Sequence, residues 1–265
     1  MIRGFVILAE NTEEVNYVRC AEALAYSIRC VMPKANISLL SSSRSSCFDQ
    51  CIPLPYGDLA PESDWKLIND WQVYEGSPYD ETIKLEADMW MPRSIEHWWD
   101  LLALQDVVVS TTIRTFKGEI ATNRFYRRFI DDNLLPDVYN AITYFKKSPT
   151  AQKFFNVVRD VFENWPSYRE IFKCSQEEPV STDWAYALAC HIIGEEKTTM
   201  PFFKEMSMVH MKQHINTMPG EDWTKTLVYE CMPDALRVHT FTQSHLFHYH
   251  IKSFANVLLR EYNGG

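Results

Sequence analysis

Glu86 and Asp88 stand two residues apart at the end of the apolar stretch TIKLEADM, residues 82–89. The stretch alternates like a β-strand, so both carboxylates are expected to point to the same side. Open α/β sheets bind ligands where their strands end. Paired carboxylates suit a hard divalent cation such as Mg²⁺ or Mn²⁺, which keeps positions open for substrate phosphates. The alternative is a pair of exposed charges at a strand exit.

A second group of polar residues lies near the end of the chain, in FHYHIK, residues 247–252. In a strand, His248, His250 and Lys252 share one face. A neutral imidazole can complete a metal shell and a lysine can neutralise a phosphate, but a surface strand is the alternative. His210 and His214 have the spacing of one helix face, and with no third ligand evident beside them we interpret both as structural.

Two further polar residues are candidates for a catalytic role. Asp183 follows a Ser-Thr pair at an expected helix start, where the helix dipole alone would favour a carboxylate. A carboxylate beside an aromatic residue also suits a sugar hydroxyl, and both interpretations stay open. Asn140 interrupts an apolar strand, so it needs a hydrogen-bond partner if buried, supplied either by the backbone or by a cleft.

The elements that must position these residues alternate between strand and helix. Residues 4–9 read as a buried strand, 13–32 as an amphipathic helix and 36–41 as a second strand, which implies a parallel sheet with a right-handed crossover. The later expected elements are a helix at 64–75, strands at 82–87, 106–111 and 137–145, and helices at 94–104, 148–165 and 182–191. After residue 200 come short strands at 206–210, 225–230, 235–240 and 245–250 and a helix at 252–262.

This order predicts an α/β fold. We expect one domain over residues 1–265, with a core at 1–200 and an irregular C-terminal extension at 201–265 that closes the site.

Composition narrows the classes of function. The chain has 265 residues, 46% of them hydrophobic, and a net charge of −9. That charge excludes a general electrostatic attraction for nucleic acid or acidic lipid. No stretch approaches the length of a membrane helix, the apolar start is too short for a signal peptide, and the seven cysteines are scattered. We therefore expect a reduced cytoplasmic protein with no membrane partner.

The order of these features resembles GT-A-fold nucleotide-sugar glycosyltransferases, especially the glycogenin-like and bacterial galactosyltransferase group. The first strand ends in Ala9-Glu10-Asn11, a later strand ends in Glu86-Ala87-Asp88, and the late histidine and lysine element follows. The resemblance implies a Rossmann-type mixed sheet flanked by helices, with Mn²⁺ or Mg²⁺ as cofactor and a UDP-sugar as donor.

The resemblance also implies roles for individual residues. Glu86 and Asp88 would bind the metal, with His248 or His250 completing its shell and Lys252 on the diphosphate. The nucleotide site would comprise Ala9, Glu10, Asn11, Tyr17 and Lys84. The motif has Glu where the family has its first Asp, so Asp88 is the firmer ligand. The family's glycine between histidine and lysine is absent, which leaves His248 and His250 both as candidates.

The expected reaction is transfer of a hexosyl or pentosyl group to an acceptor hydroxyl, with Asp183 orienting that hydroxyl or removing its proton and Asn140 beside it. The alternatives are a nucleotidyltransferase, which would normally show more carboxylates, and a non-catalytic interaction protein. The sequence also looks like proteins of tailed bacteriophages, which points to hydroxymethylated pyrimidine in DNA as the acceptor. A saccharide or other small molecule is the alternative acceptor.

One segment fits the DNA interpretation despite the negative net charge. Residues 114–128 carry five basic side chains against the single acid Glu119; the five are Arg114, Lys117, Arg124, Arg127 and Arg128. Such a loop could pair with phosphates and stack an exposed base on an aromatic ring. The alternative is a solvated loop whose arginines pair with acidic side chains of the protein.

Overall fold

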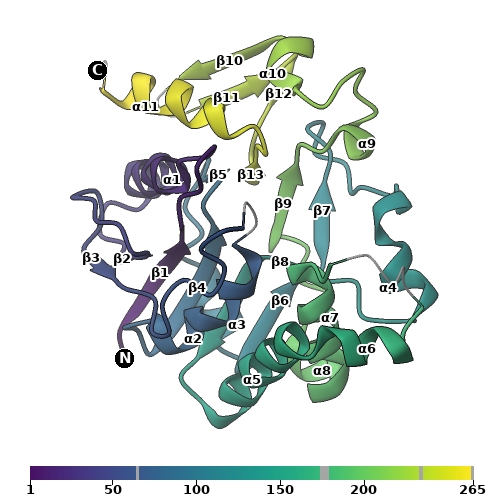
Figure 1. The fold of residues 1–265 in the computed structure, drawn as a ribbon. Helices are drawn as coiled ribbons and strands as arrows, with labels where there is room; N and C mark the ends of the chain where they lie inside the picture. Colours follow the sequence, from purple (N-terminus) through teal and green to yellow (C-terminus); the bar gives the residue numbers. More distant parts are fainter. Residues whose placement is uncertain (64–65, 174–178, 233–234, 264–265) are drawn as a thin grey trace.

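A computed structural model describes residues 1–63, 66–173, 179–232 and 235–263. Its centre is a six-stranded mixed sheet (Figure 1). In spatial order the strands are β3 (Gln50–Ile52), β2 (Ile37–Leu40), β1 (Arg3–Leu8), β4 (Glu81–Glu86), β8 (Tyr139–Lys146) and β6 (Val107–Ser110). The first four strands are parallel, and β8 is antiparallel to both of its neighbours.

Strand alternation divides the apolar residues between two helix layers. In β1, Phe5 and Ile7 belong to the core cluster that contains α1 (Tyr17–Val31), whereas Val6 belongs to the cluster that contains α5 (Pro149–Glu163) and α7 (Thr182–Ile193). A period of two along a strand requires this division. The expected α/β class, with a mixed sheet flanked by helices, is therefore confirmed.

A second sheet brings the late part of the chain beside the end of β4. Its strands are, in order, β5 (Met89–Trp90), β13 (Leu246–His248), β9 (Ser207–His210) and β7 (Thr112–Arg114). Because β5 starts directly after Asp88, the pairing of β13 with β5 places His248 opposite Met89. A small third sheet consists of β10 (Tyr229–Met232), β11 (Ala235–Val238) and β12 (Phe241–Thr242).

The remaining helices are short. They are η1 (Leu67–Gln72), α2 (Val73–Gly76), α3 (Trp98–Leu102), η2 (Phe125–Arg127), α4 (Arg128–Asp132), α6 (Trp165–Ile171), α8 (Glu195–Thr198), α9 (Gln213–Asn216), α10 (Trp223–Thr226), η3 (Lys252–Phe254) and α11 (Ala255–Asn263). None of the helices in the described part of the chain has the length and apolar character needed to cross a membrane.

Several expected boundaries are wrong. The helix expected at 94–104 is shorter and forms only α3. The strand expected at 225–230 begins as the helix α10, because the Asp222 side chain accepts a hydrogen bond from the Thr224 N–H and caps a helical turn. Between the strands expected at 106–111 and 137–145, where the sequence predicts no element, the chain forms η2 and α4. Residues 64 and 65, at the start of the helix expected at 64–75, lie outside the described residues.

Candidate active site

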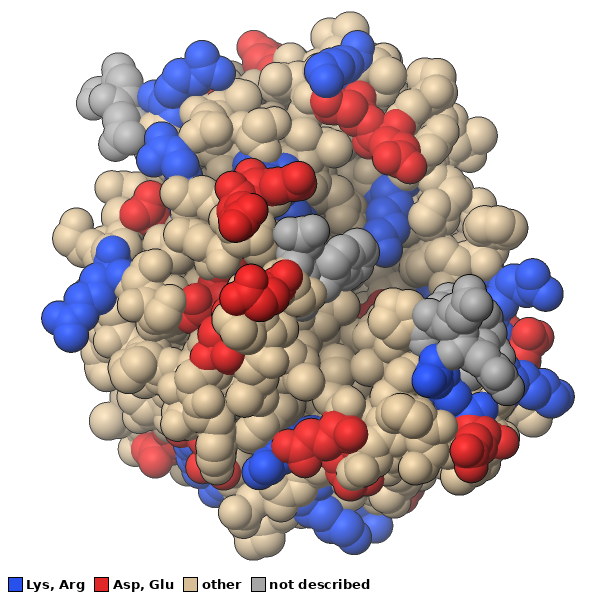
Figure 2. Space-filling model, viewed as in Figure 1, with Lys and Arg blue, Asp and Glu red and all other residues tan. Residues whose placement is uncertain are grey.

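A cleft of about 550 Å³ opens at the carboxyl ends of β1 and β4. The chain continues from β1 to β2 on one side of it, while β4 lies on the other. Ligands of open α/β sheets bind at such a change of direction, because the segments leaving the two strands separate there. Figure 2 shows the face of Figure 1 hollowed near its centre.

Glu86, Asp88 and His248 converge in this cleft. The His248 Nε2 atom lies 3.0 Å from Asp88 Oδ2 and 3.3 Å from Glu86 Oε2. One ligand atom from each of the three residues lies within 4.8 Å of the others. Strand β4 ends at Glu86 and a turn follows, so the turn and the pairing of β5 with β13 bring these groups together rather than alternation within one strand.

The charges around Asp88 keep it ionised. Burial opposes its ionisation, but His248 and Lys252 outweigh burial and hold the pKa of Asp88 well below its usual value. Burial raises the pKa of Glu86, against the opposing charges of His248 and Lys84. The Lys252 ammonium donates a hydrogen bond to Asp88, and although burial works against its charge, Asp88 raises the pKa of Lys252 above its usual value.

A second lysine borders the cleft. Lys84 is 1% exposed, and its Nζ lies 2.6 Å from Asp70 Oδ2 and donates to the Asn140 carbonyl at 3.2 Å. Tyr186 donates a hydrogen bond to the other oxygen of Asp70. Sequence reasoning missed Asp70, because nothing in its own segment marks it as the partner of a strand lysine.

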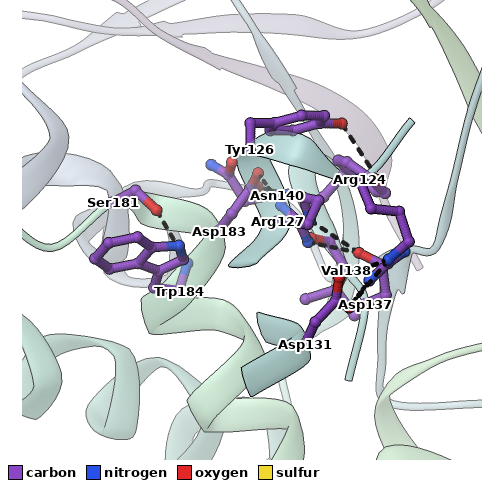
Figure 3. A network of polar contacts seen from close by, with 11 residues as sticks. Arg124, Tyr126, Arg127, Asp131, Asp137, Val138, Asn140, Ser181, Asp183 and Trp184 are labelled. Carbon is purple, nitrogen blue, oxygen red and sulfur yellow. Dashed lines mark hydrogen bonds and ion pairs between the residues drawn. The ribbon is translucent and has the colours of Figure 1, made fainter. Parts of the chain in front are cut away.

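Asp183 lies on the wall formed by β8 and α7 (Figure 3). Its Oδ2 accepts a hydrogen bond from Arg127 at 2.7 Å, and its Oδ1 accepts from the Asn140 backbone N–H at 2.9 Å. The Asn140 side chain also faces the cleft; with its amide turned to match the donors and acceptors around it, the nitrogen lies 3.0 Å from Asp183 Oδ1 and the oxygen 2.9 Å from Lys84 Nζ. Asp183 is thus held in one orientation at the cleft wall.

The residues expected to hold the nucleotide are only partly brought together. Ala9, Glu10 and Tyr17 line the cleft, and Lys252 Nζ lies 5.4 Å from the centre of the Tyr17 ring. The Glu10 carboxylate already has a partner within the protein, since it accepts a hydrogen bond from the Ser42 hydroxyl at 2.7 Å. Asn11 does not line the cleft; its Oδ1 accepts from the Val18 N–H at the start of α1.

Arg124 and Arg127 pair with acidic side chains of the protein, as in the alternative interpretation of the basic segment. Arg127 is 2% exposed and is surrounded by Asp137, Asp183 and the Val138 carbonyl, while Arg124 pairs with Asp131 and Asp137 (Figure 3). Asp131 and Asp137 come just after the basic segment 114–128, and Asp183 lies much later in the chain. A count of charges within the segment therefore misses these ion pairs.

None of the five basic side chains of this segment lines the cleft. Arg114 donates hydrogen bonds to the Gly118 and Lys204 carbonyls, whereas Lys117 and Arg128 are exposed. On the face shown in Figure 2, basic side chains are scattered among acidic ones rather than gathered into one patch.

The expectation that His210 and His214 share one helix face is wrong. His210 ends β9 and pairs in register with His248, and both line the cleft with His250. His214 lies on α9, apart from them, with its ring 4.7 Å from that of Tyr126. The alternation in the segment 206–210 predicts the strand β9. It does not predict that β9 pairs with β13, whose His248 follows His210 by 38 residues.

No protein-family model matches the chain, and no curated protein matches it. Among solved structures the chain is similar to the galactosyltransferase LgtC in complex with donor and acceptor sugar analogues, with a TM-score of 0.49 and 13% identity over 70% of each chain. It is also similar to mouse xyloside xylosyltransferase 1, with a TM-score of 0.46 and 8% identity over 75% of this chain and 84% of that one.

A third similar structure is the glycosyltransferase GlyE of Streptococcus pneumoniae, with a TM-score of 0.43 and 10% identity over 75% of this chain and 45% of that one. These are likenesses in backbone arrangement.

Proposed function

We propose that this chain is a divalent-metal-dependent glycosyltransferase that moves a sugar from a nucleoside diphosphate sugar to an acceptor hydroxyl. The observation that carries the proposal is the convergence of Glu86, Asp88 and His248 beside Lys252, in a cleft at the switch point of the sheet. Two carboxylates and an imidazole fit Mn²⁺ or Mg²⁺. A neighbouring ammonium group fits a diphosphate.

Glu86, Asp88 and His248 Nε2 are the groups that would hold the metal. Mn²⁺ or Mg²⁺ bound there supplies a Lewis acid that stabilises the charge of the leaving diphosphate. Lys252, which pairs with Asp88 in this structure, is placed to turn to a diphosphate oxygen. Ala9, Glu10 and Tyr17 line the end of β1, where we place the nucleotide, and a UDP-sugar is the donor that we propose.

Asp183 is the acceptor-side residue in this proposal. Both of its oxygens are held, Oδ1 by Asn140 and Oδ2 by Arg127, yet Oδ2 retains a lone pair that can accept a hydrogen bond from a hydroxyl. A fixed carboxylate of this kind orients the acceptor toward the donor sugar. Because Arg124 and Arg127 are committed to internal acids, we propose a saccharide or another small hydroxyl compound as acceptor, in preference to modified DNA.

Thermal unfolding with UDP, GDP, ADP and CDP, each with and without Mn²⁺, tests this proposal. A ligand at 100 times its Kd adds about 2.7 kcal/mol, and about 2–4 °C per kcal/mol is typical at this chain length. We therefore expect UDP with Mn²⁺ to raise the Tm by about 5–10 °C, and EDTA to remove the shift. The proposal is wrong if no nucleoside diphosphate stabilises the protein with Mn²⁺, or if nucleoside triphosphates do so and release pyrophosphate.

A further inference from the structure

Three imidazoles meet at the edge of the cleft, on the side of His248 away from the carboxylates. His210 Nδ1 lies 3.2 Å from His248 Nδ1 and 3.2 Å from His250 Nε2. One nitrogen from each of these three rings lies within 4.8 Å of the others. The three rings are thus arranged around a common point from which each can offer a nitrogen.

The backbone builds this arrangement from two strands and one unusual residue. The parallel pairing of β13 with β9 puts His248 and His210 side by side on one face of the sheet. His250 joins them because its backbone adopts a left-handed φ of 58°, which costs energy for a residue with a Cβ. Neighbouring contacts hold it there, since Trp223 Nε1 donates to the Tyr249 carbonyl at 2.7 Å. Such strain is concentrated at functional sites.

His210 is the ring that the other two share, and its side chain is buried. His210 Nδ1 faces two nitrogens at once, and as a donor it can satisfy only one of them. A cation would accept a lone pair from each ring.

This group of ligands differs chemically from the carboxylate group. The two nitrogens of His248 point in different directions, with Nε2 toward Glu86 and Asp88 and Nδ1 toward His210. Three imidazoles select a transition metal such as Zn²⁺ or Co²⁺, whereas carboxylates suit Mg²⁺ and Mn²⁺. If Nδ1 binds a metal, Nε2–H can donate to Asp88, and a carboxylate on the outer nitrogen is the usual support for a metal-binding histidine.

We propose that His210, His250 and Nδ1 of His248 form a second metal site, for an ion of the Zn²⁺ or Co²⁺ class, with Asp88 supporting His248 from outside. The site does not depend on the sugar-transfer proposal, because a metal ion alone can occupy it. The two sites share His248, so an ion on Nδ1 competes with a metal on Nε2.

Co²⁺ binding to the metal-free protein tests the site, because Co²⁺ held by imidazoles absorbs visible light. The Asp88→Asn variant serves as the background, since it weakens the carboxylate site and leaves the three histidines in place. We expect it to bind one Co²⁺ per chain without nucleotide. Adding His210→Ala or His250→Asn should weaken Co²⁺ binding by more than the roughly 10–100-fold that the loss of an outer support costs. Asn tolerates the left-handed backbone at position 250, which protects folding.

His191→Ala in the same background is the matched control, because His191 is exposed on α7, outside the cleft lining. It should bind Co²⁺ like the background variant. The inference is overturned if neither the unaltered protein nor the Asp88→Asn variant binds Co²⁺, or if the His210 and His250 variants, shown to be folded by circular dichroism, bind it unchanged. Co²⁺ binding by the Asp88→Asn variant, together with no response of the unaltered protein to UDP and Mn²⁺, would instead contradict the proposed function and leave the histidine site standing.

Discussion

Replacing Asp88 with Asn is expected to lower donor turnover by about 10²–10³-fold, the cost of removing one group that stabilises charge in a transition state. Asp88 is buried, contacts His248 and Lys252, and is the carboxylate that the neighbouring charges keep ionised. Asn is nearly the same size but carries no charge, so the metal and Lys252 both lose their anionic partner. Mn²⁺-dependent binding of UDP, measured by calorimetry, should fall in parallel.

Asp100→Asn is the matched control for this change. Asp100 has an 86% exposed side chain and pairs with Arg3 at the surface, so its loss should change both turnover and stability little. Unaltered Mn²⁺-dependent binding of UDP in the Asp88 variant would show that Asp88 is not a metal ligand. Loss of the folded state in that variant would assign Asp88 a structural role.

Replacing Arg127 with Met is expected to lower the free energy of unfolding by about 3 kcal/mol, near the lower end of the roughly 3–5 kcal/mol cost of breaking a buried ion pair. The guanidinium is 2% exposed and donates to Asp137, Asp183 and the Val138 carbonyl at 2.9, 2.7 and 2.6 Å. Met fills similar space but leaves all three acceptors without this donor. The lower figure applies because Asp137 and Asp183 remain 31% and 26% exposed.

Urea unfolding measures this effect, as a lower midpoint with an unchanged m-value. Arg128→Met is the control, because Arg128 is exposed and adjacent in sequence, and surface substitutions of this kind usually stay within about 0.5 kcal/mol. Equal midpoints for the two variants would mean that Arg127 is not the residue that fixes Asp183. If Arg127 positions Asp183, its variant should also raise the KM for the acceptor more than that for the donor.

The sequence predicts what local periodicity controls. The alternating strand that ends at Glu86, the helix capped by Ser148 and the helix that begins beside Asp183 were all predicted within a few residues. Each of these features depends on neighbours within one element, either on the face that a strand side chain takes or on a cap at a helix end.

The relations between distant elements were not predictable in the same way. His210 joins His248 only because β9 pairs with β13, and that register is set by packing rather than by either segment alone. Arg127 donates a hydrogen bond to Asp183, which lies 56 positions later in the chain. The basic residues next to Arg127 in the sequence therefore do not indicate this role. Asp70 was missed for the same reason, as its partner Lys84 lies on β4.

Release of nucleoside diphosphate from a panel of UDP-, GDP-, ADP- and CDP-sugars by the purified protein tests the central claim most directly. Mass spectrometry would follow the products with and without Mn²⁺. We predict UDP release that requires Mn²⁺, stops on addition of EDTA, falls to background in Asp88→Asn and persists in Asp100→Asn. The account is contradicted if none of these donors yields its diphosphate in a Mn²⁺-dependent manner, or if Asp88→Asn releases UDP as fast as the unaltered protein.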